Sequence, residues 1–104
     1  MIRSYEDLDV YRRSYRLALE INELCKKLPR SELHGLSSQL RRASRSVPSN
    51  IAEGFGRKVH PKEFQNFLLI ALGSNDEVIF NIKFMKDASY YKFEEELAKN
   101  LFSK

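Results

Sequence analysis

The chain has 104 residues, of which 42% are hydrophobic and 31% charged, and its formal net charge is +4. This composition is typical of one globular domain and excludes a disordered chain. The longest apolar run, residues 67–72, is far shorter than the roughly 20 residues that cross a bilayer, and the amino terminus lacks a signal-peptide pattern. A lone cysteine, Cys25, excludes an internal disulfide. We therefore expect a single cytoplasmic domain over residues 1–104 with no membrane partner.

Positive charge is concentrated in the first part of the chain. Residues 1–62 hold 13 Lys or Arg against 7 Asp or Glu, whereas residues 63–104 hold 5 against 7. A basic surface of this kind is what a polyanionic partner such as RNA or DNA requires. Moderate positive charge also serves solubility alone, so the distribution by itself leaves both interpretations open.

The first predicted helix begins after Ser4, because Ser4 followed three residues later by Asp7 forms a capping-box pattern. Apolar residues then recur at helical spacing along two adjacent stripes, which indicates a wide buried face. Pro29 is expected to close this helix, since the residue before a proline disfavours the α conformation.

Three tyrosines accompany the arginines of this first segment: Tyr5, Tyr11 and Tyr15. Proteins that bind single-stranded nucleic acids do stack bases on such rings. Their helical spacing with leucines nevertheless favours packing in the core or at an interface over a ligand role.

The second predicted helix has Ser31 as its cap. Gly35 weakens the first turn, so the regular part is expected to begin near Ser37. Gly54 and Gly56 are expected to end the helix, because glycine is typical of helix carboxyl ends.

Pro48 lies inside this second helix. Proline has no amide hydrogen to donate, and its ring clashes with the carbonyl of Ser44, so the helix should bend there. The apolar seam of the helix continues beyond the proline at Ile51 and Phe55. We therefore expect a proline-kinked helix that does not stop at residue 48.

The third predicted helix begins at Pro61, which suits a first helical position. Apolar residues cover most of its circumference, which indicates burial against more than two neighbours and favours self-association. Residues 87–91 are predicted to form a turn, and a short fourth helix is predicted over residues 93–102. The sequence thus predicts an all-α, up-down antiparallel four-helix bundle with a proline-kinked second helix and a short fourth helix.

Several short motifs together resemble one protein family. They are Gln39–Ala43, Val47–Gly54, and the positions Phe64, Phe67, Leu68 and Ala71 followed by Gly73 and Ser74. On these residues the chain is similar to the four-helix-bundle proteins encoded in 23S ribosomal RNA intervening sequences. Those proteins in turn resemble the accessory protein of diversity-generating retroelements. The resemblance, which covers Tyr5 to Tyr91, implies a ring-like homopentamer whose molecular role is poorly defined.

Seven basic residues are the predicted contacts for an RNA or DNA backbone. They are Arg12, Arg13, Arg16, Arg41, Arg45, Arg57 and Lys58. Arg41 and Arg45 are one helical turn apart, and the planar guanidinium pairs bidentately with phosphate, so these two could bind adjacent phosphates. The alternative is a scaffold that binds only itself or another protein, in which the arginines form ion pairs or a solvated face.

Five polar residues beside the predicted core are expected to be partly buried and to form a structural network. They are Gln39, Arg42, Glu53, Asn75 and Glu77. Because a buried charge must be paired, we expect Glu53 or Glu77 to pair with Arg41 or Arg42 and to fix the register of the helices.

No catalytic or metal site is predicted. Glu53 and Glu77 could form a carboxylate pair such as hydrolases use, but no nucleophile, metal cluster or phosphate-binding glycine loop accompanies them. His34 and His60 have no companion at ligand spacing. We therefore expect a protein that is not an enzyme and that needs no cofactor.

Overall fold

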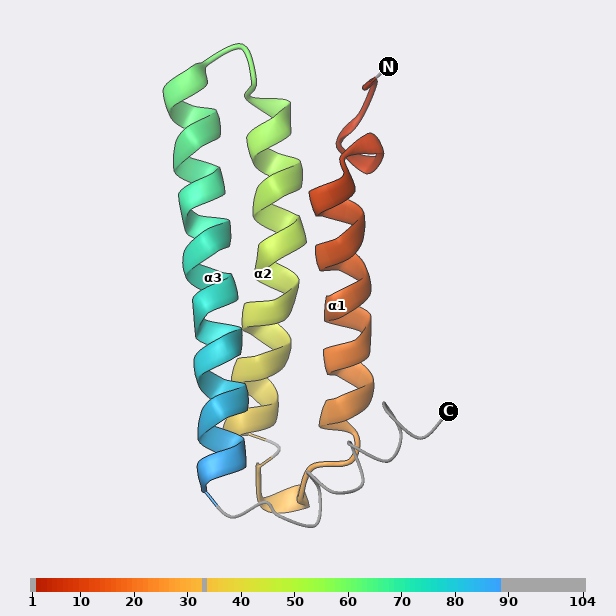
Figure 1. Ribbon diagram of the computed structural model, residues 1–104, viewed down its shortest axis with the longest axis vertical. Helices are drawn as coiled ribbons and strands as arrows, with labels where there is room; N and C mark the ends of the chain where they lie inside the picture. Colours follow the sequence, from red (N-terminus) through yellow and green to blue (C-terminus); the bar gives the residue numbers. More distant parts are fainter. Residues whose placement is uncertain (1, 33, 89–104) are drawn as a thin grey trace.

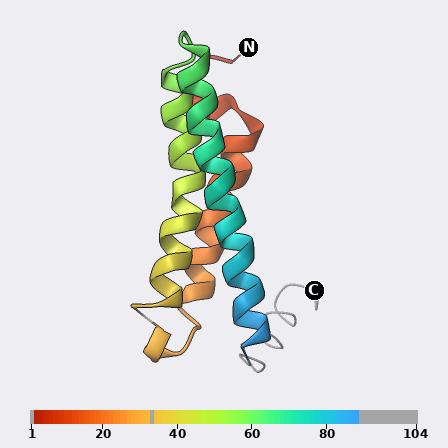
Figure 2. The same cartoon turned by 90° about the vertical axis from the view of Figure 1, so that its left-hand side faces the viewer.

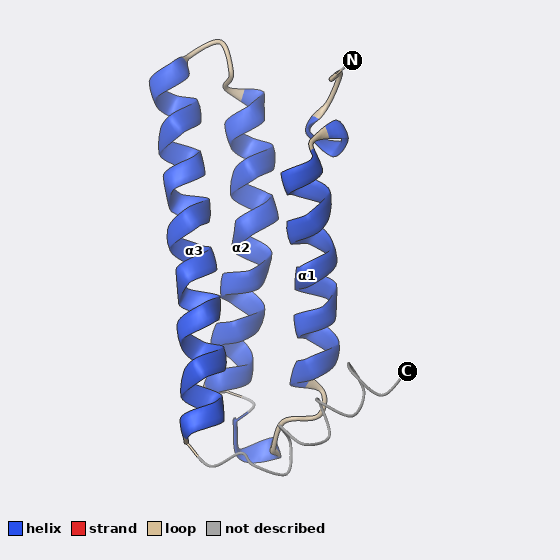
Figure 3. Ribbon diagram, viewed as in Figure 1, coloured by secondary structure: helices blue, strands red, loops and turns tan. Residues whose placement is uncertain are grey.

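Three long helices make up the fold. The computed structural model describes residues 2–32 and 34–88, and within these ranges it contains no strand (Figure 3). The α-helices are α1 (Asp9–Cys25), α2 (Leu36–Gly56) and α3 (Pro61–Asp87), and two 3₁₀ turns, η1 (Tyr5–Asp7) and η2 (Arg30–Glu32), precede α1 and α2. The all-α class is therefore confirmed. The predicted fourth helix over residues 93–102 lies outside the described residues, so the four-helix bundle stays a prediction.

The amino-terminal turn has the predicted hydrogen-bonded cap. The Ser4 hydroxyl accepts a hydrogen bond from the Glu6 amide at 3.0 Å, and the Asp7 carboxylate accepts one from the Ser4 amide at 3.1 Å. This capping box caps the start of the 3₁₀ turn η1, however, and not the start of α1. Leu8 is extended between the two, and α1 begins at Asp9. The box therefore fixes the direction in which the chain enters α1.

Helix α1 ends at Cys25, four residues before the proline that was expected to close it. The amides of Lys27 and Leu28 bond to the carbonyls of Leu24 and Cys25, three residues back. The chain thus tightens into 3₁₀-type turns before it reaches Pro29. These turns supply donors to the last carbonyls of the helix, and Leu28 is buried.

Helix α2 begins at Leu36, one residue from the predicted start of its regular part. Its N-cap residue is Gly35, and the Glu32 carboxylate in the preceding turn accepts a hydrogen bond from the Leu36 amide at 3.3 Å. The prediction that Ser31 caps this helix is wrong, because Ser31 lies within the 3₁₀ turn η2. An acidic side chain at this end also suits the positive pole of the helix dipole.

Pro48 does not interrupt α2, as predicted. The helix continues for 21 residues with Pro48 buried in its interior. The Ser44 hydroxyl donates to the Arg41 carbonyl at 3.2 Å in the turn that precedes the proline. The helix ends at Gly56, whereas Gly54, the other expected terminator, lies inside the helix.

Helix α2 lies between α1 and α3, and successive helices run in opposite directions (Figure 1). Figure 2 shows α3 crossing obliquely in front of α2. One cluster of buried residues joins the end of α1, the start of α2 and the second half of α3. Its members are Ile21, Cys25, Leu28, Leu36, Leu40, Ala43, Val78 and Met85. By contrast, none of the residues of α1 before Ala18 is buried.

Gly54 permits the close approach of α2 to α3. A Cβ atom at this position would lie 2.9 Å from the Phe67 Cβ and 3.1 Å from the Phe64 ring. The Phe67 Cβ is fixed to the α3 backbone, so it cannot swing away as the end of a long side chain could. The glycine is therefore required here by space and not by helix termination.

We predict that Gly54→Ala destabilises the protein by about 1–3 kcal/mol, because the added methyl group forces α2 and α3 apart. The measurement is the free energy of unfolding from urea titration followed by circular dichroism. Gly56→Ala is the matched control, since a Cβ there meets no atom within 4 Å. Equal stability of the two variants would contradict the close-packing role of Gly54.

Candidate nucleic-acid interface

A groove of about 620 Å³ runs between α1 and α2, on the side of α2 that faces α1. We call it the tyrosine–arginine groove. Its lining comes from η1, α1 and α2: Tyr5, Tyr11, Tyr15, Ala18, Leu19, Asn22, Arg41, Ser44, Arg45, Pro48, Ser49, Ala52 and Glu53. Its volume lies within the range of small-ligand sites in proteins, and its walls combine aromatic and charged groups.

The three tyrosines form a continuous aromatic wall. The rings of Tyr5 and Tyr11 meet edge to face with their centroids 4.8 Å apart, and Tyr11 and Tyr15 stack with their centroids 5.9 Å apart. Burial and the neighbouring Tyr5 and Tyr15 raise the pKa of the Tyr11 phenol. Tyr15 is 50% exposed, so its ring remains accessible from the groove. None of the three is buried in the single chain, so the core part of the expectation is wrong, whereas packing at an interface stays a prediction.

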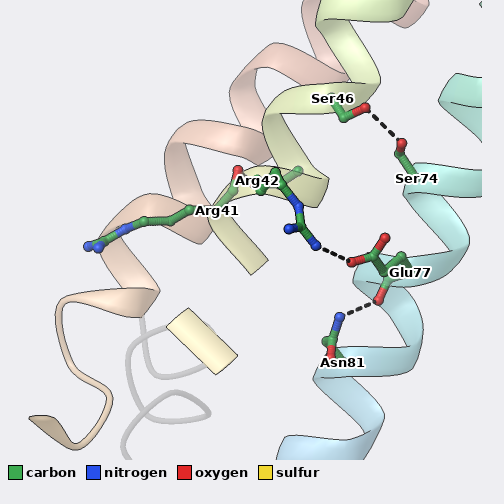
Figure 4. Close-up of polar contacts among 7 residues, drawn as sticks. Arg41, Arg42, Ser46, Ser74, Glu77 and Asn81 are labelled. Atoms are coloured by element: carbon green, nitrogen blue, oxygen red, sulfur yellow. Dashed lines mark hydrogen bonds and ion pairs between the residues drawn. The ribbon is translucent and has the colours of Figure 1, made fainter. Parts of the chain in front are cut away.

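Arg41 and Arg45 line the α2 wall of the groove, one helical turn apart. The Nε atom of Arg41 is buried and has no hydrogen-bond partner among the described residues. Arg45 is exposed and forms no ion pair within the part of the chain that the structure describes. Figure 4 shows that Arg41 points away from α3, whereas its neighbour Arg42 points toward it. The sequence prediction that Arg41 and Arg45 share one side is thus consistent with the geometry.

Arg12 and Arg16 flank the same groove from α1. Each follows a groove tyrosine in the sequence, and one residue step of about 100° places it on the outer side of that ring. Both side chains are exposed, and neither forms an ion pair with any described residue. Two of the seven predicted basic residues, Arg41 and Arg45, therefore line the groove, and Arg12 and Arg16 are next to its tyrosines in the sequence.

The other three predicted basic residues lie elsewhere. Arg13 pairs with Asp9 at 2.9 Å and lines a second groove of about 370 Å³, which α1, α2 and α3 form together. At the α2–α3 turn, Arg57 pairs with Glu63 at 3.2 Å. Lys58 lies 3.9 Å from the centre of the Phe55 ring. The structure does not bring these three residues to the tyrosine–arginine groove.

The predicted polar network is more exposed than expected. Arg42 pairs with Glu77 across α2 and α3 at 3.5 Å, but both side chains are more than 40% exposed (Figure 4). Gln39 and Glu53 are also exposed, and only Asn75 is half-buried. The expectation of partial burial is thus wrong for four of the five residues within a single chain. Glu53 instead lines the tyrosine–arginine groove.

A different polar network fastens α2 to α3, and the sequence analysis missed it. The Ser74 hydroxyl donates to the Ser46 hydroxyl at 2.8 Å (Figure 4). The Asn50 amide donates to the Ser46 carbonyl at 2.8 Å and to the Ser46 hydroxyl at 2.9 Å. Asn50, Gly54 and Ser74 are all motif residues of the resemblance noted above, so these motifs serve helix packing. Their small or short polar side chains were the signal for such a contact.

The side of α3 that faces away from α2 is apolar. We call it the α3 outer face, and its members are each more than half exposed: Leu69, Ile79, Phe80 and Phe84. The Phe80 and Phe84 rings stack with their centroids 6.4 Å apart. Exposed apolar surface of this extent marks interaction sites in many soluble proteins.

Cys25 is not a reactive thiol in this fold. It is buried, and its Sγ atom lies 3.7 Å from the Ser37 carbonyl, to which it donates. Burial raises the pKa of the thiol above its usual value and outweighs the nearby Arg41 guanidinium. Within the described ranges no three His, Cys, Asp or Glu side chains gather as metal ligands, and no helix could span a membrane.

The fold and the groove together define a small all-helical protein with a candidate polyanion-binding surface. The family model of the 23S rRNA-intervening sequence protein matches residues 6–103. The chain therefore belongs to the 23S rRNA-intervening sequence protein family, as its motifs indicated. It matches none of the curated proteins with which it was compared.

We predict that the exposed Arg42–Glu77 pair contributes less to stability than the half-buried serine contact. A double-mutant cycle of Arg42→Gln and Glu77→Gln should give a coupling energy below about 1 kcal/mol that falls with added salt. Ser74→Ala should cost about 1 kcal/mol independently of salt, because it removes the hydrogen bond between the Ser74 and Ser46 hydroxyls, which joins α3 to α2. Thermal unfolding at low and high salt measures both, and a larger, salt-sensitive cost for Glu77→Gln would reverse this ranking.

Proposed function

We propose that this protein is a non-enzymatic, oligomeric helical protein that binds the backbone of RNA or DNA. The observation that carries the proposal is that Arg41 and Arg45 line the tyrosine–arginine groove, with Arg12 and Arg16 next to its tyrosines in the sequence. Arg12, Arg16 and Arg45 have no ion-pair partner in the part of the chain that the structure describes, and Arg41 has a buried Nε atom without an acceptor. A phosphate would supply a partner for the exposed guanidinium groups of Arg12, Arg16 and Arg45.

The chemistry of phosphate binding fits this arrangement. Guanidinium groups pair bidentately with phosphate oxygens, and each neutralised phosphate releases counterions. A groove lined by several arginines therefore gains affinity without reading the base sequence. The family description also refers to an intervening sequence of 23S rRNA, which agrees with a nucleic-acid context.

The two acids considered for catalysis lie on different parts of the surface. Glu53 lines the tyrosine–arginine groove, whereas Glu77 is on α3 and pairs with Arg42. This separation supports a binding role over hydrolysis by a carboxylate pair, which requires the two groups to flank one bond.

Self-association is the second part of the proposal. The α3 outer face is apolar and exposed in the single chain, so a second copy that covered it would remove this surface from water. Several copies would also multiply the net charge of +4, and weak phosphate contacts would then combine by avidity. The homopentamer implied by the family resemblance is one such assembly.

A protein-binding scaffold is the alternative function. The α3 outer face supports it directly, because the same apolar side chains could contact a different protein. In that case the arginines would serve solubility, and the protein would not bind nucleic acid at low salt.

We predict that binding to a generic RNA falls steeply as salt is raised from low to physiological concentration. Arg41→Gln combined with Arg45→Gln should weaken binding and reduce the slope of log K against log salt by about 1.4–1.8, since each phosphate contact contributes about 0.7–0.9. Arg13→Gln removes the same kind of charge outside the groove and should change the slope little. Fluorescence anisotropy measures the affinity of the wild type and of both variants for the RNA. An affinity that does not change with salt concentration would favour the scaffold.

We also predict that Phe80→Glu reduces the mass of the oligomer, because the new charge on the α3 outer face would be buried in the contact between copies. Light scattering coupled to size-exclusion chromatography measures the mass. Val59→Glu is the matched control, since Val59 is 77% exposed in the α2–α3 turn. A wild-type protein that elutes as a monomer would remove the oligomeric part of the proposal.

A further inference from the structure

We propose that the tyrosine–arginine groove binds single-stranded nucleic acid, with a base stacked on Tyr15 and the adjoining phosphates held by Arg41 and Arg45. This inference rests on the proposed function, because it specifies the class of nucleic acid that the same groove accepts. Three features of the groove carry it: its accessible aromatic ring, its size, and the separation of its charges.

The aromatic wall suits an unpaired base. Tyr11 supports Tyr15 from behind through a stacked contact at 5.9 Å, and Tyr5 supports Tyr11 in turn at 4.8 Å. This leaves Tyr15 oriented by its neighbours while half of its surface stays exposed. A base stacked on such a preformed ring orders few new side chains, which keeps the entropy cost of binding low.

The aromatic lining and the volume of the groove favour a single strand over a duplex. A base pair inside a double helix stacks only on other base pairs, so a duplex offers the protein its phosphates and groove edges. The three tyrosines and the neighbouring Leu19 would then face water or sugar without a stacking partner. A volume of about 620 Å³ accepts a small-ligand-sized group such as a splayed nucleotide.

The charges of the groove are separated along α2. Arg41 and Arg45 lie toward the start of α2, and Glu53 lies two turns beyond Arg45. A phosphate is attracted to the arginines and repelled by Glu53. The nucleic-acid backbone should therefore lie at the end of the groove that Arg41 and Arg45 line. The Glu53 carboxylate is then free to accept hydrogen bonds from base amino groups, which a phosphate cannot donate.

A single-stranded ligand explains the unpaired arginines better than a second copy of the chain does. Arg12, Arg16 and Arg45 are exposed cations around an aromatic surface, and a copy seated there would have to desolvate them. The exposed apolar surface available for such a contact lies on the α3 outer face instead. Occupation of the groove by a second copy is therefore an outcome of the test below.

The experiment compares an unstructured oligoribonucleotide of about 12 nucleotides with a duplex of the same length at low salt, by fluorescence anisotropy. Tyr15→Ala should weaken single-strand binding roughly tenfold and leave duplex binding unchanged. Tyr15→Phe keeps the ring and should bind as the wild type does. Val59→Ala removes exposed apolar surface outside the groove, so it is the matched control. Because the chain contains no tryptophan, quenching of tyrosine fluorescence by the single strand reports stacking in the wild-type protein as well.

Each result has a distinct meaning. Loss of affinity in Tyr15→Ala together with quenching supports the inference. Unchanged single-strand affinity in Tyr15→Ala, with weakened binding in the Arg41→Gln, Arg45→Gln variant, overturns base stacking but retains phosphate binding. No binding of either RNA at low salt removes the proposed function itself. A change of mass in Tyr15→Ala, or absence of quenching in the wild type, would assign the groove to protein contact and overturn the inference.

Discussion

The close contact of α2 with α3 is the constraint on which the rest of the structure depends. Gly54 lets the two backbones approach each other. The hydrogen bond between the Ser46 and Ser74 hydroxyls fixes the position of one helix along the axis of the other. Once α3 is held on one side of α2, α1 can pack only on another side, and the walls of both grooves follow. The residues that mark the family therefore serve two places. Asn50, Gly54 and Ser74 lie where α2 meets α3, whereas the motif residues Arg41, Pro48, Ser49, Ala52 and Glu53 line the tyrosine–arginine groove.

The helices could be predicted largely from the sequence because their signals are local. The capping pattern at Ser4, the continuation of α2 through Pro48 and the start of α3 at Pro61 all depend on residues a few positions apart. Helix ends were less predictable, since α1 closes at Cys25 through hydrogen bonds that only the folded turn reveals. The packing role of Gly54 could not be inferred, because the sequence alone does not distinguish a glycine inside a helix from a glycine at its end.

The candidate site was predicted in part. Helical spacing placed Arg41 and Arg45 together, but it could not show that Arg13 faces a different groove and is already paired with Asp9. It also assigned the tyrosines to packing, because leucine-like spacing does not reveal whether a partner helix is close enough to cover a ring. The separation of α1 from α2 around Tyr15 is a tertiary property, and it turns a core pattern into an accessible surface.

The uneven core has a mechanical consequence for the amino-terminal half of α1. Buried residues anchor this helix from Ala18 onward, whereas none of the preceding residues of α1 is buried. Segments with few buried apolar contacts open locally at a fraction of the free energy of global unfolding. We therefore expect the start of α1 to open at a lower free energy than α2, so that the two walls of the groove differ in local stability.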